Sequence, residues 1–316
     1  MCTMTDTQPV SREYPPLDAQ TSDRWYAGGQ YFAWNGHRIF VRMSNNPDAE
    51  PLMLLHGFPT SSFDWLPIWE ELTQRFHVMA FDYLGFGLSD KPRGIRYTLH
   101  GQADLAQALA EQFFRRDFHV IAHDYGVTVA QELLARTAEG RGLAILSCMF
   151  LNGGLFAQLH RARPIQRLLA GPFGSLFVRL VNRKRFGKSF AAVFGPDTKP
   201  SDLELDAYWK IICTNGGDRL QHKLLHYMAD RREHASRWNH VVKSPPCAIA
   251  LTNGLLDPVS GEHLVDYVNQ LNSAIPIWRL ASIGHYPQTE APGAVLESYY
   301  SFRCTLGGDC EDQEII

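Results

Sequence analysis

The sequence lacks several features that would assign it to a particular class of protein. It has no run of about 18 apolar residues, the length that a membrane-spanning helix needs. Its net charge is -3, without the excess of Lys and Arg that nucleic-acid-binding proteins carry. Residues 1–20 are polar and proline-bearing, with none of the apolar stretch of a signal peptide. These absences predict a cytoplasmic protein that neither spans a membrane nor binds nucleic acid.

Cysteine and histidine patterns typical of metal sites are also missing. The six cysteines are scattered, with no C-x-x-C pair and no His-rich spacing for zinc, so we expect free thiols and no metal. One basic cluster, Arg183-Lys184-Arg185, is interpreted as a solvated surface rather than a phosphate site, because charge runs usually have that role. Neither pattern indicates a cofactor.

The 316 residues are enough for one large α/β domain with an insertion. Asn35-Gly36 between two apolar runs predicts a hairpin. Apolar runs of strand length then alternate with segments of helical spacing, which predicts a mostly parallel sheet. These runs are residues 51–56, 76–82, 119–123, 144–151, 246–251 and 275–280.

A long interruption separates the fourth and fifth of these runs. Residues 155–241 have helix-length segments broken by prolines and no convincing strand, so they are predicted to form an inserted helical cap. The expected organisation is therefore a flexible tail over residues 1–22, a core over 23–154 and 242–316, and a cap over 155–241. The oligomeric state is left open between monomer and homodimer.

The most informative stretch is His123-Asp124-Tyr125-Gly126, between an apolar run and a helical pattern. This layout predicts a sharp turn at the carboxyl end of a strand, where open α/β sheets place their ligands. Asp124 then has two interpretations. It could cap the following helix, since Asp is favoured there, or it could be a reactive carboxylate.

Three more motifs follow predicted strands, namely His56-Gly57-Phe58-Pro59, Asn253 to Pro258 with Asp257, and Gly284-His285-Tyr286-Pro287. Each has a simpler explanation as a turn. Carboxyl ends of parallel strands meet at one sheet edge, however, and four such motifs in this order favour a common site. The sequence has no G-x-S-x-G motif, and its nearest approach, residues 187–191, lies inside the insertion without a preceding strand.

The turn at Asp124 resembles the nucleophile elbow of α/β-hydrolases that use aspartate, the epoxide hydrolases and haloalkane dehalogenases. The resemblance implies that Asp124 is the nucleophile, and that His285, oriented by Asp257, activates water. The H-G-x-P loop resembles the oxyanion loop of the same enzymes. The backbone amides of Phe58 and Tyr125 would then form the oxyanion hole.

Longer stretches are similar to the mesoderm-specific transcript hydrolase family, whose animal members carry a membrane-directed N-terminal segment that this chain lacks. The stretches are residues 56–65, 81–92, 123–134 and 282–288. The resemblance implies the α/β-hydrolase fold, a mostly parallel eight-stranded sheet flanked by helices with an inserted helical cap.

A carboxylate is ionised near pH 7, so Asp124 needs no base to attack an electrophilic carbon. The expected reaction is formation of an alkyl-enzyme ester and its hydrolysis, with a small apolar electrophile and water as partners and no cofactor. For an epoxide, Tyr208 and Tyr227 resemble the cap tyrosines that protonate the departing oxygen, although both could be packing residues.

Two other readings stay open. A haloalkane dehalogenase needs N–H donors for halide, which Trp65, Trp209 or Trp238 would have to supply, and an ester hydrolase could use the same three residues. Dehalogenases usually have Trp after the nucleophile, where this chain has Tyr125, which counts against halide. The remaining alternative is a binding protein that keeps the pocket with little turnover.

Overall fold

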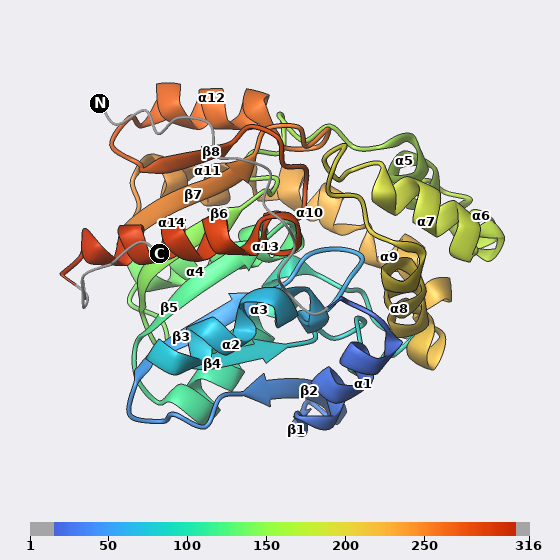
Figure 1. The fold of residues 1–316 in the computed structure, drawn as a ribbon, viewed down its shortest axis with the longest axis horizontal. Helices are drawn as coiled ribbons and strands as arrows, with labels where there is room; N and C mark the ends of the chain where they lie inside the picture. Colours follow the sequence, from blue (N-terminus) through green and yellow to red (C-terminus); the bar gives the residue numbers. More distant parts are fainter. Residues whose placement is uncertain (1–15, 308–316) are drawn as a thin grey trace.

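The computed structural model describes residues 16–307 as an eight-stranded sheet with helices on both faces (Figure 1). The strand order is β1-β2-β4-β3-β5-β6-β7-β8, in which β2 runs antiparallel to β1 and β4 and the other neighbours are parallel. This confirms the predicted α/β-hydrolase fold. The strands are β1 (Gln30–Trp34), β2 (His37–Met43), β3 (Glu50–Leu55), β4 (Phe76–Phe81), β5 (Phe118–His123), β6 (Ile145–Leu151), β7 (Ala248–Gly254) and β8 (Ile277–Leu280).

The central strands are apolar throughout because both sheet faces are covered. In β5, Val120 and Ala122 point into one core layer and Ile121 into the other. Burying these side chains on both faces is the main stabilisation of the sheet, at about 25 cal/mol per Å². The first layer contains residues of α3 (Leu99–Leu109), α4 (Tyr125–Ala138), α11 (Ala235–Lys243) and α12 (Glu262–Leu271), and the second contains residues of α2 (Leu66–Arg75) and α14 (Pro292–Cys304).

The predicted hairpin is confirmed, because Asn35 and Gly36 join β1 to β2 with φ of 47° and 77°. Two consecutive positive φ values match the turn that Asn-Gly favours. The flexible tail expected over residues 1–22 lies mostly outside the described residues. For its last residues the prediction is wrong. Helix α1 (Ala19–Ala27) begins inside it, capped by Asp18, and buries Trp25 against Trp69.

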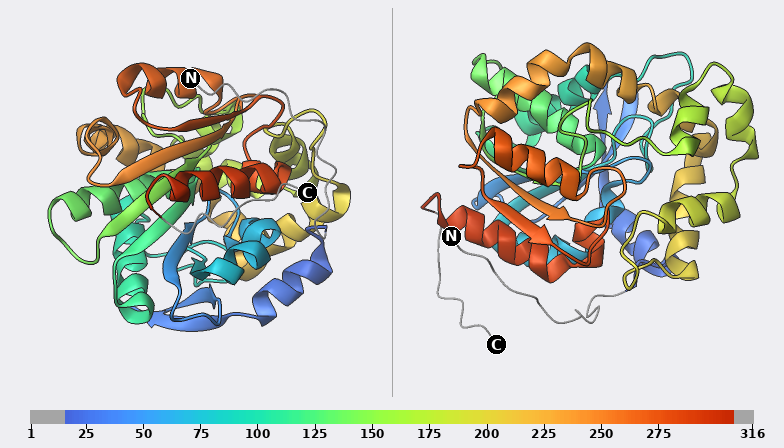
Figure 2. Two further views of the ribbon diagram at one scale, coloured as in Figure 1. Left: turned by 60° about the vertical axis from the view of Figure 1, so that its left-hand side comes forward. Right: turned by 90° about the horizontal axis from the view of Figure 1, so that it is seen from above.

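The insertion between β6 and β7 is helical, as predicted, and lies along one side of the sheet (Figure 2). Its last helix, α11, packs against α4 and extends to Lys243, two residues past the expected cap boundary. None of the helices within residues 16–307 is long and apolar enough to cross a bilayer. The other helices of the insertion are α5 (Pro164–Ala170), α6 (Gly174–Phe177), α7 (Arg183–Ala191), α8 (Asp202–Cys213), α9 (Gln221–Leu224) and α10 (Tyr227–Glu233).

Candidate active site

Asp124 lies on the sharp turn between β5 and α4, with φ of 46° and ψ of -103°. A non-glycine residue with positive φ is strained, and such strain is found mainly where function requires it. The side chain makes no capping hydrogen bond to α4. The capping interpretation is therefore wrong, and the carboxylate points elsewhere.

Two glycines allow the end of β3 to approach this turn. A Cβ on Gly126 would lie 2.2 Å from the carbonyl oxygen of Leu55, and a Cβ on Gly57 would lie 2.9 Å from Cβ of Asp124. Neither separation is sterically possible, so both positions require glycine. The close approach brings the amide of Phe58 to Asp124.

The two oxygens of Asp124 have different surroundings. Oδ2 accepts a hydrogen bond from the backbone N–H of Phe58 at 2.9 Å. Oδ1 lies 3.7 Å from Nε2 of His285, beyond hydrogen-bond length. The structure thus brings Asp124, Phe58 and His285 together, and Tyr125 follows directly as the first residue of α4.

Asp257 lies on the far side of the imidazole, with its Oδ2 2.7 Å from Nδ1 of His285. The same carboxylate accepts hydrogen bonds from the amides of Val259 and Ser260, the Ser260 hydroxyl and Nδ2 of Asn152. Burial opposes ionisation of Asp257, but the charge of His285 and these donors hold its pKa well below the usual value. Asp257 is therefore a fixed negative charge.

Two opposing effects set the pKa of His285. Burial lowers the pKa, whereas the charge and hydrogen bond of Asp257 and the charge of Asp124 raise it, and the net result is a pKa of about 9. The imidazole is therefore a cation at neutral pH. Losing the charge on Asp124 would remove one of the causes that raise this pKa.

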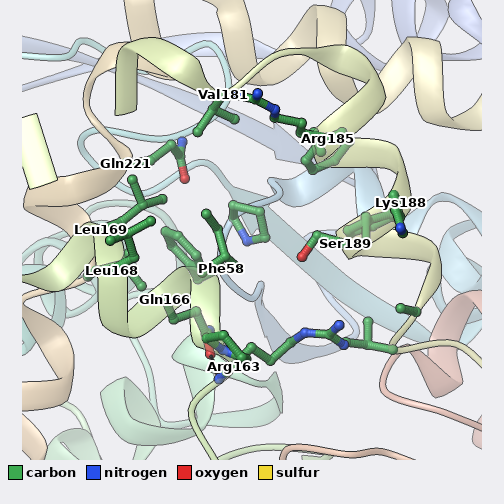
Figure 3. Close-up of a pocket in the computed structure, with 18 of the residues that line it drawn as sticks. Phe58, Arg163, Gln166, Leu168, Leu169, Val181, Arg185, Lys188, Ser189 and Gln221 are labelled. Carbon is green, nitrogen blue, oxygen red and sulfur yellow. Dashed lines mark hydrogen bonds between the residues drawn. The ribbon is translucent and has the colours of Figure 1, made fainter. Parts of the chain in front are cut away.

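A cavity of about 650 Å³ reaches Asp124 and His285 from the cap side. Figure 3 shows Leu168 and Leu169 of α5 on one side, Lys188 and Ser189 of α7 on the other, and Phe58 between them. Carbon atoms form most of its wall, so it suits an apolar ligand. Other lining residues include Ile165, Phe177, Leu180, Phe186, Phe190, Trp209, Ile212 and Tyr286.

The two cap tyrosines predicted as acids occupy different places, and neither belongs to the cavity lining. Tyr208 is buried between the rings of Phe63 and Phe190. Tyr227 packs against Phe58 and Tyr125, the two residues whose amides were predicted to form the oxyanion hole. Burial, and then the charge of Asp124, raise the pKa of Tyr227 far above its usual value, which keeps its hydroxyl protonated.

Sequence reasoning missed a polar cluster beside Tyr227. Buried Arg231 donates from Nη2 to the carbonyl of Asp124 at 3.1 Å and from Nε to Thr128 at 2.7 Å, which ties the elbow to the cap. Its Nη1, both ring nitrogens of His160 and the Tyr227 hydroxyl are buried without hydrogen-bond partners among residues 16–307. Burial, with the charges of Arg231 and His285, lowers the pKa of His160 to about 3, so this ring is neutral.

Glu290 was also missed. Its carboxylate accepts hydrogen bonds from the amides of Gly284 and Tyr286, on either side of His285, and from Gly195 and Thr198 of the cap. It therefore fixes the histidine loop against the insertion. A polar residue following a strand could have indicated Asn152, but nothing local marks Glu290 inside α13 (Pro287–Glu290).

The predicted halide donors differ in availability. The indole N–H of Trp238 donates to Glu132 at 2.9 Å, so it cannot serve the site. Trp65 is fully buried, whereas Trp209 lines the cavity.

Within residues 16–307, no three His, Cys, Asp or Glu side chains are placed to hold a metal ion.

The chain is similar to several known proteins. Residues 52–298 match the alpha/beta hydrolase family. The human mesoderm-specific transcript homolog protein is 39% identical over 299 residues, which cover 91% of this chain and 89% of that protein.

Two solved structures share the fold at lower identity. A loop variant of the haloalkane dehalogenase DbeA from Bradyrhizobium elkanii is 20% identical with a TM-score of 0.73, covering 88% of this chain and 98% of its own. The epoxide hydrolase CorEH is 18% identical with a TM-score of 0.71, covering 88% and 99%. At these identities the likeness extends to the fold alone. The chain belongs to the alpha/beta hydrolase family, as a relative of the mesoderm-specific transcript proteins.

Proposed function

We propose that this hydrolase opens epoxides to diols through a covalent ester on Asp124. The observation that carries the proposal is the unequal placement of the two Asp124 oxygens. Oδ2 is held by the Phe58 amide, where an oxyanion would later develop, while Oδ1 faces His285 at 3.7 Å without a hydrogen bond. Oδ1 is thus the oxygen free to attack carbon.

In the first half-reaction, Oδ1 of Asp124 attacks an epoxide carbon and the carbon–oxygen bond of the ring breaks. The electron pair passes to the departing oxygen, which takes a proton from a tyrosine hydroxyl. Tyr227 is favoured over Tyr208 for this step because its ring packs on Phe58 and Tyr125 beside the nucleophile, and because the charge of Asp124 acts on its hydroxyl. The product is a neutral alkyl ester and a tyrosinate.

In the second half-reaction, water attacks the ester carbon of Asp124 and gives its proton to His285. Alkylation prepares this step, because esterified Asp124 has no charge and the pKa of His285 then falls. The histidine thus loses its proton only once the ester exists, and that proton returns through solvent to the tyrosinate. The amides of Phe58 and Tyr125 would stabilise the tetrahedral oxyanion. Collapse breaks the bond between the ester carbon and the alkyl oxygen, which takes the remaining proton of the added hydroxyl and leaves as the diol. Asp124 is then a carboxylate and His285 a cation again.

A haloalkane dehalogenase is the second candidate, favoured by Trp209 in the cavity wall. CorEH and DbeA have the same fold, so the fold does not choose between the two substrates. The halide would leave as an anion and need no proton, and Tyr227 would then have no chemical role.

Mass spectrometry of a His285→Gln variant tests these proposals, because loss of the base should trap the ester on Asp124. Incubation with epoxides, haloalkanes and aryl esters would separate the classes by mass. An epoxide adds its whole mass, a haloalkane adds its mass less hydrogen halide, and an ester adds an acyl group. Asp124→Asn in the same background is the control that should show no adduct.

Failure to trap any adduct from the panel, with the fold of the variant intact, would support the binding-protein alternative. Turnover of the unmodified chain in water labelled with heavy oxygen gives a second readout. Labelled oxygen should enter the Asp124 side chain over repeated turnovers, because water attacks the ester carbon. Label found only in the product would contradict the covalent route.

A further inference from the structure

Exposed apolar side chains gather on the part of the cap formed by residues 161–190, which we call the cap lobe. Of eleven large hydrophobic residues exposed within the described chain, five lie in it. Phe173 is 68% exposed and Leu176 is 60% exposed. Large apolar side chains that are exposed together usually mark a surface that binds a partner or a membrane. The other three are Ile165, Leu168 and Leu180.

The cap lobe is also strongly basic. It contains eight Arg and Lys residues and no Asp or Glu. Only Arg183 forms ion pairs within residues 16–307, with Asp202 and Asp206 of α8. The others are available to an external anion, and most are exposed, namely Arg161, Arg167, Arg179, Lys184, Arg185 and Lys188.

Apolar and basic side chains of the cap lobe both line the large cavity. Ile165, Leu168 and Leu180 are exposed and also line it, so its apolar wall continues onto the outer surface. Arg163, Arg185 and Lys188 line the same cavity (Figure 3). Helices α5, α6 and α7 lie at the edge of the molecule, away from the sheet (Figure 1), so a flat surface could meet them without obstruction.

A second cavity, of about 400 Å³, adjoins the lobe at the 3-10 helix Val178–Leu180. Arg179 of the lobe contributes to its wall, and no Asp or Glu does. Its chemistry suits an anionic headgroup, since guanidinium and ammonium groups are strong donors to phosphate. The remaining basic lining residues are Lys91, Arg93, Arg219, His222 and Lys223.

We propose that the cap lobe docks on the surface of an anionic lipid bilayer. Apolar side chains at the tip would enter the boundary between headgroups and acyl chains, while the surrounding cations bind lipid phosphates. A protein partner would require matching acidic and apolar patches, whereas an anionic bilayer supplies both chemistries everywhere. Docking does not depend on the proposed reaction, although it would place the cavity mouth against apolar substrates dissolved in lipid.

Co-sedimentation of the full chain with vesicles tests the proposal. Binding should be strong with vesicles of phosphatidylcholine and phosphatidylglycerol, weak with phosphatidylcholine alone, and reduced by added salt. Phe173→Ser/Leu176→Ser and Arg167→Glu/Lys184→Glu should each weaken it about tenfold or more. The matched controls are Tyr31→Ser/Leu306→Ser and Arg232→Glu/Lys243→Glu, exposed residues outside the lobe, which should bind like the parent chain.

All four variants should keep the parent's turnover of a water-dissolved substrate, since none alters a residue that lines the large cavity. Absence of vesicle binding by the parent chain would overturn the proposal. Equal losses of vesicle binding in the lobe variants and the control variants would overturn the proposal too. A concentration-dependent dimer in sedimentation velocity that Phe173→Ser/Leu176→Ser abolishes, without vesicle binding, would assign the lobe to a second copy of this chain instead.

Discussion

Nδ1 of His285 lies 2.7 Å from Oδ2 of Asp257, and this contact directs the other ring nitrogen, Nε2, toward Asp124. Asp257→Asn would remove the charge that raises the pKa of His285 and would loosen the ring. We expect kcat to fall about 10³- to 10⁴-fold, as when an orienting carboxylate is lost from a triad. Steady-state kinetics would measure the loss, and NMR titration should show a lower pKa for His285.

Asp266→Asn is the matched control for this prediction, because Asp266 pairs with Arg279 on the surface. Its kinetics should stay within error of the parent. A comparable loss of kcat in both variants would show that the Asp257 contact has no special part in activity.

The folded-state pKa of His285 also predicts how stability depends on pH. Because this pKa rises from the ordinary 6.5 to about 9, its contribution to stability is complete below pH 6.5 and is lost between pH 6.5 and 9. Chemical denaturation of the parent and of His285→Gln should give free energies of unfolding whose difference shrinks by up to about 3 kcal/mol over this range. A flat difference for His285→Gln would contradict the raised pKa.

The close packing of the elbow makes a separate prediction about Gly126. A Cβ there would collide with the backbone of Leu55, which cannot move without shifting β3. Gly126→Ala should lower the free energy of unfolding by about 2 kcal/mol or more, measured by urea denaturation. Gly94→Ala, where nothing lies within 4 Å of the added Cβ, is the control and should be close to neutral.

The parts of the site that the sequence predicted all have local signals. Apolar runs bounded by turn residues predicted β3, β5, β7 and β8. Because parallel strands end at one edge, the sequence also predicted that Asp124, His285 and Phe58 would meet. Predicting that these residues meet did not require knowing how the insertion folds, because the insertion leaves the sheet and returns to it between β6 and β7.

The residues that the sequence did not predict depend on contacts between distant segments. Glu290 accepts from Gly195, 95 residues earlier, and Arg231 binds the carbonyl of Asp124 across 107 residues. In both of these hydrogen bonds the partner is a backbone group, which has no sequence signature. The separation of Tyr208 from Tyr227 has the same origin, because it is set by how α8 and α10 pack on the core.

The position of Tyr227 gives a prediction that separates the two candidate substrates. In the His285→Gln background, where the ester accumulates, rapid-mixing mass spectrometry can measure its rate of formation. Tyr227→Phe should slow ester formation from an epoxide about 100-fold or more, because the departing oxygen loses its proton donor. The matched variant Tyr208→Phe, at the ring between Phe63 and Phe190, should have a smaller effect.

Ester formation from a haloalkane should be almost unchanged by Tyr227→Phe, since a halide leaves without a proton. An equal loss for both substrate classes would mean that Tyr227 only shapes the site, as its packing on Phe58 and Tyr125 would allow. An epoxide rate that survives in the Tyr208→Phe/Tyr227→Phe double variant would eliminate both tyrosines as acids. The proton would then have to come from another donor near Asp124.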